Sequence, residues 1–387
     1  MVPVTSSPLK KLLGVAREIT ETVIAPNAEA EDAEARWPQP AMRALADAGL
    51  MGLHVPAELG GHGLGLGALV AVTDVLAQES PSTALCFAMH GVGTAVITAK
   101  ATDYQKQAYL EPIARGEHIT TLALSEPGTG SHFYIPQSRV TRAGDEFVLE
   151  GTKTFVTNGS RADSYVMSTA VEVEGGAEGM FSCVLVDEGT PGMEWQEEWR
   201  GLGMRSNSSR TVHLEGVRVS TRNLLGEEGD QLWYVFEVIA PYFLMAMAGT
   251  YTGVARAAFE IALENLGSRR HAHSGDLLGA NPVVAHRLGE LWMELEKTRR
   301  LVSAAAEEGD AGDPDSLVAV LAAKAAASEA AVGIANEAMT LVGGIGYREN
   351  GKLSRMLRDA RASHVMAPTT DMLKTWVGRA LLKLPLI

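Results

Sequence analysis

The stretch EFVLEGTKTFVTNG at positions 146–159 decides the fold class, because its residues alternate between apolar and polar types with a period of two. The same alternation, rich in Val, Thr and Tyr, recurs in SYVMSTAVEV (164–173) and SRTVHLEGVRV (209–219), with Gly, Asn and Pro turns between the segments. Such patterns are typical of β-strands with one buried face. They predict a compact antiparallel β domain over residues 118–228.

The residues on either side of this segment have apolar spacing typical of α-helices. Apolar positions recur three and four residues apart from Pro8 to about Glu117, and the same spacing returns after Gly229 and persists to the C-terminus. The order of helices, strands and helices predicts an α+β fold. We expect a helical domain over 1–117, the β domain over 118–228 and a second helical domain over 229–387.

Length and charge exclude several classes of protein. The chain has 387 residues, enough for about two to four domains and too many for one small binding module. Its net charge of −14 argues against general binding to nucleic acid or to anionic membranes. No apolar run reaches the ~20 residues of a membrane span, and the first residues lack the pattern of a targeting signal. A cytoplasmic location without membrane attachment is therefore expected.

Common catalytic and metal-binding motifs are missing from the sequence. It contains no G-x-G-x-x-G, P-loop, G-x-S-x-G or H-E-x-x-H pattern, so nicotinamide on a Rossmann fold, P-loop chemistry, an elbow serine and a zinc protease site are unsupported. His271, His273 and His286 lack the spacing of metal ligands, and no metal is expected. Cys86 and Cys183 lie among apolar residues, which predicts reduced thiols rather than a disulfide scaffold.

Three segments carry residues that could contact a ligand. LALSEPGTGS (122–131) follows a predicted strand and combines hydroxyl groups with glycines that let backbone donors approach a ligand. GTKTFVTNG (151–159) places an aromatic ring and a hydroxyl on one face of a strand. TLVGGIGYRENG (340–351) ends a helix at paired glycines, where an anion could bind. Alone, each segment also fits an ordinary turn, a core aromatic or a helix stop.

Together and in this order, these segments resemble the acyl-CoA dehydrogenase family of flavoproteins. The resemblance covers nearly the whole chain and includes GLMGLHVPAELGGHGLG (49–65), LGMRSNSSRTVHLEGVRV (202–219), NLLGEEG (223–229) and SRMLRDAR (354–361). It implies a helical domain, a β domain and a four-helix bundle, with FAD between the last two, usually in a homotetramer. It also implies an acyl-thioester substrate and an electron-transfer flavoprotein or a similar electron acceptor.

By position, the resemblance also implies which residues contact FAD. Ser125 would lie near the flavin ring, Ser131 near the pyrophosphate or the phosphates of the substrate, and Arg269 would reach the FAD of a neighbouring subunit. The full set of expected cofactor contacts is Leu122, Leu124, Ser125, Gly130, Ser131, Phe155, Val156, Thr157, Arg269, Thr340, Leu341, Val342, Gly343, Gly344, Thr370, Asp371 and Met372.

The resemblance fails at the substrate. Most family members remove the α-proton of the acyl group with a glutamate that stands just before Gly-Thr, and the matching residues here are Ala367 and Pro368. A minority place the glutamate on the first helix of the C-terminal domain, where this chain has Phe243 with Leu244 beside it. Alanine cannot accept a proton. We expect Ser131, Phe243, Leu244, Ala367 and Pro368 to contact the substrate.

Four other residues are candidates for the missing base. They are His364, Asp371, His90 and Glu237, and for each a purely structural role is the alternative. A neutral histidine is a suitable proton acceptor near pH 7.

The expected function is FAD-dependent α,β-dehydrogenation of an acyl thioester, carried on coenzyme A or on an acyl-carrier protein, with a non-standard base. Two alternatives stay open. One is a different flavin reaction, of the monooxygenase or desulfinase type. The other is a non-catalytic subunit of a mixed acyl-CoA dehydrogenase oligomer.

Overall fold

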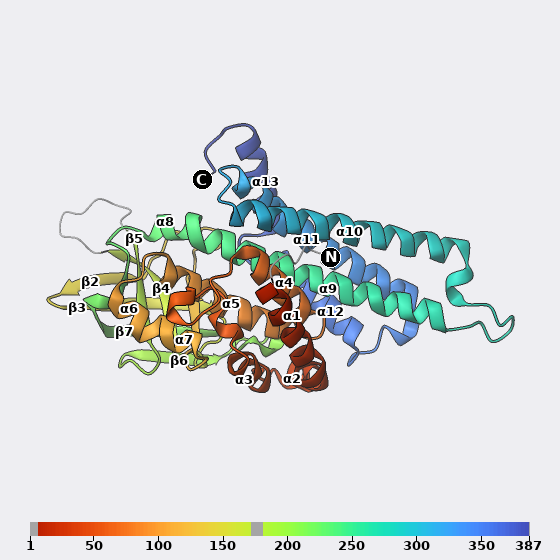
Figure 1. Ribbon diagram of the computed structural model, residues 1–387, viewed down its shortest axis with the longest axis horizontal. Coiled ribbons are helices and arrows are strands. Elements are labelled where there is room, and N and C mark those ends of the chain that lie inside the picture. The colour runs from red at the N-terminus through yellow and green to blue at the C-terminus, as the bar shows by residue number, and fades with distance from the viewer. Residues whose placement is uncertain (1–6, 172–180, 387) are drawn as a thin grey trace.

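The computed structural model describes residues 7–171 and 181–386. Figure 1 shows an elongated molecule with the strands at one end and three long helices extending toward the other: α9 (Ala240–Ser268), α10 (Pro282–Asp310) and α11 (Ser316–Val342). Helices close to the N-terminus pack between these two regions. The predicted α+β order of helices, strands and helices is confirmed.

Helices form the N-terminal part of the described chain. The longer ones are α1 (Ser7–Ile19), α2 (Ala25–Glu34), α3 (Gln39–Asp47), α4 (Leu66–Ala77) and α5 (Pro81–Ala99). The short ones are η1 (Thr20–Ile24), η2 (Leu50–Gly52), η3 (Ala57–Leu59), α6 (Asp103–Gln105), η4 (Lys106–Leu110) and α7 (Glu111–Ala114). α4 and α5 are the most apolar, and both pack against α9.

One mixed sheet forms the central part. Its strands are β1 (Thr120–Ala123), β2 (Arg139–Ala143), β3 (Glu146–Val156), β4 (Ser164–Val171), β5 (Phe181–Asp187), β6 (Met193–Glu198), β7 (Arg210–Ser220) and β8 (Leu224–Leu225), with η5 (Arg205–Asn207) and η6 (Thr221–Asn223) between them. The spatial order is β6-β7-β3-β2-β4-β5-β8, and β1 pairs with β4.

Most of the segment 146–159 forms β3, which pairs with β7, and these two are the longest strands of the sheet. β3 and β7 pair antiparallel, so that Phe147 faces Val219 and Leu149 faces Val217. All four side chains are buried in a core that belongs to the β domain. The period of two therefore has the predicted cause, because one face of these strands packs inward and the other lies toward solvent.

The prediction of an antiparallel β domain is wrong at β4. This strand pairs parallel with β1, where Leu122 faces Val166, and it pairs parallel with β2 at two further positions. The other pairs of the sheet, namely β2–β3, β3–β7, β4–β5, β5–β8 and β6–β7, are antiparallel. The strands in the parallel pairs are not consecutive in the chain. Their relative direction therefore depends on tertiary packing, which a local sequence pattern does not contain.

Helices also form the C-terminal part. Besides α9, α10 and α11 these are α8 (Gln231–Trp233), η7 (Tyr234–Ile239), η8 (Leu278–Ala280), η9 (Gly343–Ile345), α12 (Lys352–Ala362) and α13 (Thr370–Leu381). α9 packs against α4, α5, α10, α11 and α12, and it is the central helix of the large hydrophobic core. The domain boundaries expected at 117/118 and 228/229 stay predictions, and the nearest elements are β1 and α8.

Three helical stretches are long and apolar enough to cross a bilayer by length and composition, contrary to the expectation from sequence. They are Pro81–Ala99, Gln231–Ser268 and Ser316–Ile345. More than half of each apolar window is buried inside the protein. Packing of these helices against one another therefore accounts for much of their apolar character, because a helix that is hydrophobic all round is typical of a buried core as well as of a membrane.

The two helical parts are joined where α10 ends against the start of α4. Asp310, the last residue of α10, accepts hydrogen bonds from the backbone N–H groups of Leu66 (2.5 Å) and Gly67 (2.9 Å). These are donors at the first turn of a helix, which have no partner within the helix itself. Gly65 allows this approach, since a Cβ atom there would lie 2.1 Å from Asp310 Oδ1.

We expect Asp310→Ala to lower the free energy of unfolding by about 1 kcal/mol, the usual cost of removing a helix cap. The measurement is the midpoint of chemical denaturation. Glu308→Ala is the matched control, because Glu308 is an exposed acid in the same last turn of α10. Equal midpoints for the two variants would contradict the capping role.

Candidate functional site

A cavity of about 860 Å³ lies between the β domain and the helices on both sides of it, and we call it the large cavity. Its wall contains residues from α5, from the segment after β1, from the end of β3, from the loop between β6 and β7, from the start of α9 and from the α12–α13 junction. Segments far apart in the sequence therefore meet around one space.

The segment after β1 forms one wall with its glycines and hydroxyl groups. Ser125, Thr129 and Ser131 line the large cavity. Gly128 and Gly130 have positive φ angles of 85° and 53°, and no heavy atom lies within 4 Å of a Cβ atom built at either position. The loop therefore presents backbone and hydroxyl groups with open space beside them, as a polar ligand group requires.

A buried ion pair supports this wall. Glu126 accepts hydrogen bonds from the ammonium group of Lys153 and from the backbone N–H groups of Gln137 (2.6 Å) and Ser138 (3.0 Å). The ammonium group also donates to the carbonyl oxygen of Ser168. Neither charged side chain is more than 2% exposed. Every charge is therefore compensated, and the pair fixes the loop after β1 to β3 and β4.

The end of β3 presents an aromatic ring to the same cavity. Phe155 has a positive φ of 52° and is 59% exposed, and its ring lies 5.7 Å from that of Trp199 in an edge-to-face arrangement. A left-handed backbone at a bulky residue is unusual and tends to occur at functional positions. Thr157 lines the cavity one alternation later. Two exposed aromatic rings beside hydroxyl groups fit a flat heteroaromatic ligand.

The backbone after Phe155 is held from the N-terminal helices. Asn158 accepts a hydrogen bond from Trp37 Nε1 (2.9 Å) and donates one to the carbonyl oxygen of Cys86 (2.9 Å). Its own N–H group donates to the carbonyl oxygen of Asn207 (3.0 Å). All of these groups are buried. This network fixes the aromatic wall at the end of β3 to η5 and α5, so the β domain and the N-terminal helices hold this wall together.

Helix α12 forms the opposite wall with charged residues. Arg358 and Arg361 line the cavity, and Arg358 also binds Asp32 of α2 and the carbonyl oxygen of Leu202. The next residue, Asp359, is buried and accepts a hydrogen bond from the N–H group of Met204 (2.6 Å). Burial raises the pKa of Asp359 to about 6, although the bond from Met204 lowers it. Helix α12 therefore holds the loop between β6 and β7 in place.

The expected substrate contacts divide between the cavity wall and the core. Ser131, Phe243, Ala367 and Pro368 line the large cavity, whereas Leu244 is fully buried and is not part of its wall. Among the described residues that line this cavity, the carboxylate side chain is that of Glu126, and it is already paired with Lys153. The cavity wall at position 367 is thus apolar.

None of the four candidate bases lines the large cavity. His90 is fully buried between the carbonyl oxygen of Met51 (3.0 Å) and the N–H group of Thr120 (3.2 Å), and burial lowers its pKa to about 4. Glu237 and Asp371 are exposed on η7 and at the start of α13. Burial lowers the pKa of His364, with help from Arg361, and its Nε2 atom has no partner within the described residues. A role as base stays a prediction for each.

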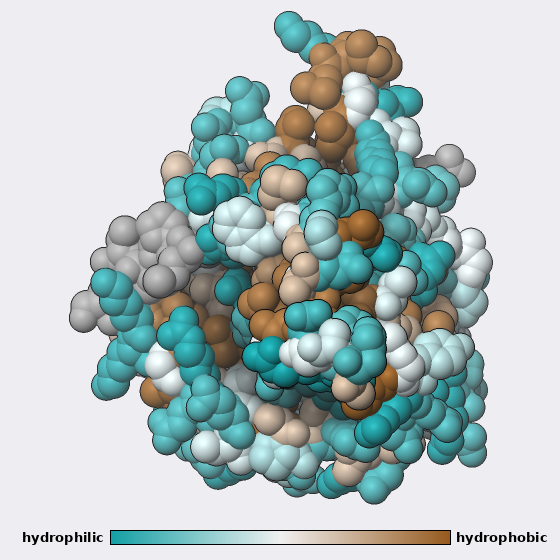
Figure 2. Space-filling model, turned by 90° about the vertical axis from the view of Figure 1, so that its right-hand side faces the viewer, coloured by the Kyte–Doolittle hydropathy of each residue, from teal (hydrophilic) through white to brown (hydrophobic). Residues whose placement is uncertain are grey.

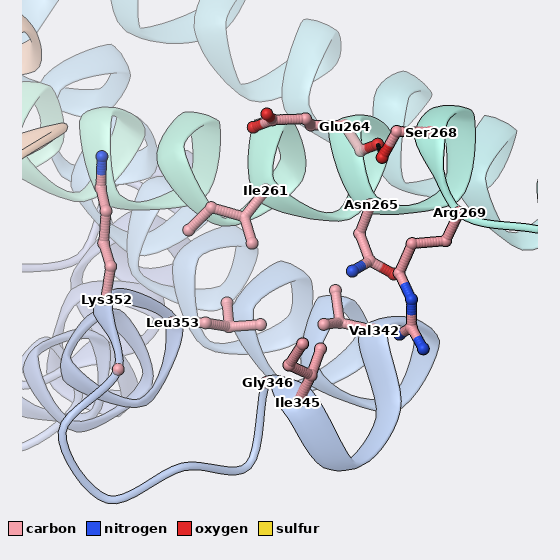
Figure 3. Close-up of a pocket in the computed structure, with 11 residues that line it drawn as sticks. Ile261, Glu264, Asn265, Ser268, Arg269, Val342, Ile345, Gly346, Lys352 and Leu353 are labelled. Carbon is pink, nitrogen blue, oxygen red and sulfur yellow. Dashed lines mark hydrogen bonds between the residues drawn. The ribbon is translucent and has the colours of Figure 1, made fainter.

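A second cavity of about 420 Å³ lies between α9 and the α11–α12 connection, and we call it the small cavity. In Figure 3 the side chains of Arg269 and Asn265 extend from the end of α9 toward the segment that carries Val342 and Ile345. Asn265 Oδ1 is buried without a hydrogen-bond partner in the described part of the chain. The guanidinium group of Arg269 fits an anionic ligand group, whereas the unpartnered amide oxygen of Asn265 fits a hydrogen-bond donor.

The expected cofactor contacts are thus divided between two cavities. Those that line the large cavity are Leu122, Leu124, Ser125, Gly130, Ser131, Phe155 and Thr157. Those that line the small cavity are Arg269 and Val342. The remaining expected contacts line neither cavity, and they are Val156, Thr340, Leu341, Gly343, Gly344, Thr370, Asp371 and Met372. No group of three or more possible metal ligands occurs in the part of the chain that the structure describes.

Sequence reasoning missed the charged residues that hold the walls. Glu126, Lys153, Arg358 and Asp359 all lie inside motifs that we quoted, but no ligand or structural role was assigned to them. The alternation in β3 contained one signal, because Lys153 shares the odd-numbered positions with Phe147 and Leu149, and all three are buried. Trp199 carried no local signal, since it lies in a polar loop.

We expect Lys153→Met to lower the free energy of unfolding by about 3 to 5 kcal/mol, because it leaves the carboxylate of Glu126 buried and unpaired. The measurement is the midpoint of chemical denaturation. The control is Arg218→Met, which breaks the exposed pair between Arg218 of β7 and Glu146 of β3 and should cost under ~1 kcal/mol. A small effect for Lys153→Met would show that the pair does not stabilise the loop.

We expect Asp359→Asn to change how stability depends on pH. The folded state holds the proton of Asp359 up to about pH 6, whereas an unfolded chain releases it near the ordinary value of 3.8. The wild type therefore loses stability as pH rises through this window, by up to about 3 kcal/mol relative to the variant. Denaturation midpoints at pH 4 to 7 measure the difference, and parallel curves would contradict the raised pKa.

Comparisons with known proteins agree with this arrangement. Three family models match in order: the N-terminal domain of acyl-CoA dehydrogenase over residues 8–117, the middle domain over 121–217 and the C-terminal domain over 243–382. Cyclohex-1-ene-1-carbonyl-CoA dehydrogenase of Geobacter metallireducens is 30% identical over 375 residues, which cover 96% of this chain and 97% of that protein.

Solved structures give the same result. Butyryl-CoA dehydrogenase of Megasphaera elsdenii superimposes with a TM-score of 0.91 at 25% identity, over 97% of this chain and 98% of that one. A prolyl acyl carrier protein oxidase superimposes with a TM-score of 0.87 at 25% identity, over 97% and 99% of the two chains. The chain therefore belongs to the acyl-CoA dehydrogenase family of flavin-dependent oxidoreductases.

Proposed function

We propose that this protein binds FAD and removes two hydrogens from the α- and β-carbons of an acyl thioester, without a carboxylate at the position where the family usually carries its base. The acyl group would be attached to coenzyme A or to an acyl-carrier protein. The observation that carries the proposal is the large cavity, whose wall unites the loop after β1, the aromatic end of β3 and the apolar position 367.

The residues present fit FAD. Open space at Gly128 and Gly130, the hydroxyl groups of Ser125 and Thr157, and the exposed ring of Phe155 support a flavin and its polar groups in the large cavity. When bound, FAD supplies the hydride acceptor for the reaction. The chain's own part is to bind the acyl thioester beside it, to orient the β-carbon and to exclude water with the apolar wall at the α12–α13 junction.

We propose further that the protein acts as a homo-oligomer, a tetramer or a dimer. Arg269 lies in the small cavity, outside the large one, which is consistent with the resemblance that gives it a role at a neighbouring subunit's FAD. Apolar residues also gather on the projecting C-terminal end in Figure 2, where α13 ends with Leu381 (70% exposed) and is followed by Leu382 (72%). An electron-transfer flavoprotein or a similar protein would accept the electrons, and a cytoplasmic location stays a prediction.

A second candidate function follows from the absence of a free acid in the described wall of the large cavity. A flavin monooxygenase or a desulfinase-like enzyme needs no carboxylate at position 367, and a non-catalytic subunit of a mixed oligomer needs no base at all. The apolar wall at Ala367 and Pro368 favours these readings over an ordinary family member.

The test is an anaerobic titration of the purified holoprotein with acyl-CoA and acyl-carrier-protein thioesters of short, long, branched and cyclic acyl chains. Prompt bleaching of the flavin by one class supports the proposal and names the acyl group. Bleaching only by an added flavin reductase would support the monooxygenase instead. A protein that cannot be loaded with FAD would favour the non-catalytic subunit.

We expect Ala367→Glu to raise the rate of thioester dehydrogenation by about 10²-fold, the lower end of what a general base contributes. Pro368 restricts the backbone of residue 367, which limits the gain. The control is Ala367→Gln, which has nearly the same shape and accepts no proton. A slower Ala367→Glu variant would show that another group is the base and that the small side chain makes room for a bulky acyl group.

A further inference from the structure

A lysine lies buried behind the wall of the large cavity and does not itself line it. Lys324 of α11 is fully buried, and its ammonium group donates hydrogen bonds to the carbonyl oxygens of Ser363 (2.9 Å) and Pro368 (3.0 Å). No carboxylate lies within ion-pair distance of it in the described ranges, 7–171 and 181–386. Burial lowers the pKa of Lys324 to about 8, so most molecules keep the charge at pH 7.

The two acceptors lie at the two ends of one turn. Ser363 is the first residue after α12, and Pro368 immediately precedes Thr369, whose hydroxyl oxygen accepts a hydrogen bond from the N–H group of Met372 at the start of α13 (3.3 Å). The turn between the two helices, residues 363–368, is thus bound at both ends by a single ammonium group.

The same turn forms part of the wall of the large cavity. Val365, Met366, Ala367 and Pro368 all line it. Lys324 contacts the backbone of the turn from the side of α11, so it acts on these residues without touching what lies in the cavity.

Stability alone does not account for a lysine at this position. A buried cation that has only carbonyl groups as partners loses more hydration than it recovers, and an apolar side chain of similar length would pack at lower cost. Its charge also acts on neighbours, since it helps to lower the pKa of His364. What the ammonium group does provide is two directed, charge-assisted hydrogen bonds to one short segment.

We propose that Lys324 is a positioning residue, which holds the turn 363–368 so that position 367 faces the large cavity. Only the consequence for dehydrogenation rests on the proposed function. The positioning itself is a property of the turn and is measured separately.

The first measurement is amide hydrogen exchange of the FAD-loaded full-length protein. In Lys324→Met we expect peptides that cover 363–368 to exchange about tenfold faster or more, because two hydrogen bonds of roughly 1 kcal/mol each are lost. The control is Lys374→Met, which removes an exposed ion pair between Lys374 of α13 and Glu329 of α11, close to the same turn in the chain. Unchanged exchange in 363–368 would overturn the proposal.

The second measurement uses Ala367→Glu, in which position 367 carries a base. Adding Lys324→Met should lower kcat about tenfold or more, because the base at position 367 is displaced. FAD content and KM should stay within about twofold, because the binding sites for FAD and substrate are unchanged. Lys324→Gln, which keeps a donor without the charge, should restore part of kcat, and it replaces Lys324→Met if that variant does not fold. Equal losses of kcat in Lys324→Met and Lys374→Met would overturn the proposal.

The two measurements separate this inference from the proposed function. Faster exchange in 363–368 without thioester turnover in any variant would support the positioning role and contradict the dehydrogenase. Turnover that needs Lys324 supports both.

Discussion

The ion pair between Glu126 and Lys153 is the interaction on which the β-domain side of the large cavity depends. Both side chains are buried, and the carboxylate also binds two backbone N–H groups at the end of the loop after β1. The lysine immediately precedes Thr154, whose N–H group donates to the carbonyl oxygen of Ser125 (2.8 Å). The loop and the strand that face a ligand are therefore fixed to each other by charge inside the protein, where an unpaired partner would be costly.

The fold class could be predicted from local patterns, because apolar residues recur every second residue in strands and every three to four residues in helices. The alternation in 146–159 became β3, and the helical spacing on both sides became the flanking helices. The parallel pairing of β4 with β1 and β2 could not be predicted, since it depends on how distant segments pack. The long apolar helices α5, α9 and α11 were likewise misjudged, because a sequence does not say whether an apolar surface meets protein or lipid.

The candidate site was predicted unevenly for a physical reason. Segments with unusual local chemistry, such as Ser125 to Ser131 and Phe155, do line the large cavity. Residues whose roles arise only from burial were missed, since Asp359 looks like an ordinary surface charge until the fold encloses it. The separation of Arg269 from the large cavity was also invisible, because it depends on the length and direction of α9.

Buried charges hold three walls of the large cavity in the same way. Lys153 with Glu126 fixes the loop after β1, Asp359 fixes the loop that contains Met204, and Lys324 binds both ends of the α12–α13 turn. Each acts mainly on backbone groups, so the backbone around the cavity is held without a contribution from the side chain at position 367. A change at position 367 can therefore remove a reactive group while the surrounding frame keeps its form. The residues around the large cavity fit FAD, the cofactor that the family resemblance implies. The few side chains in its wall, such as that at position 367, then decide which reaction the protein can carry out.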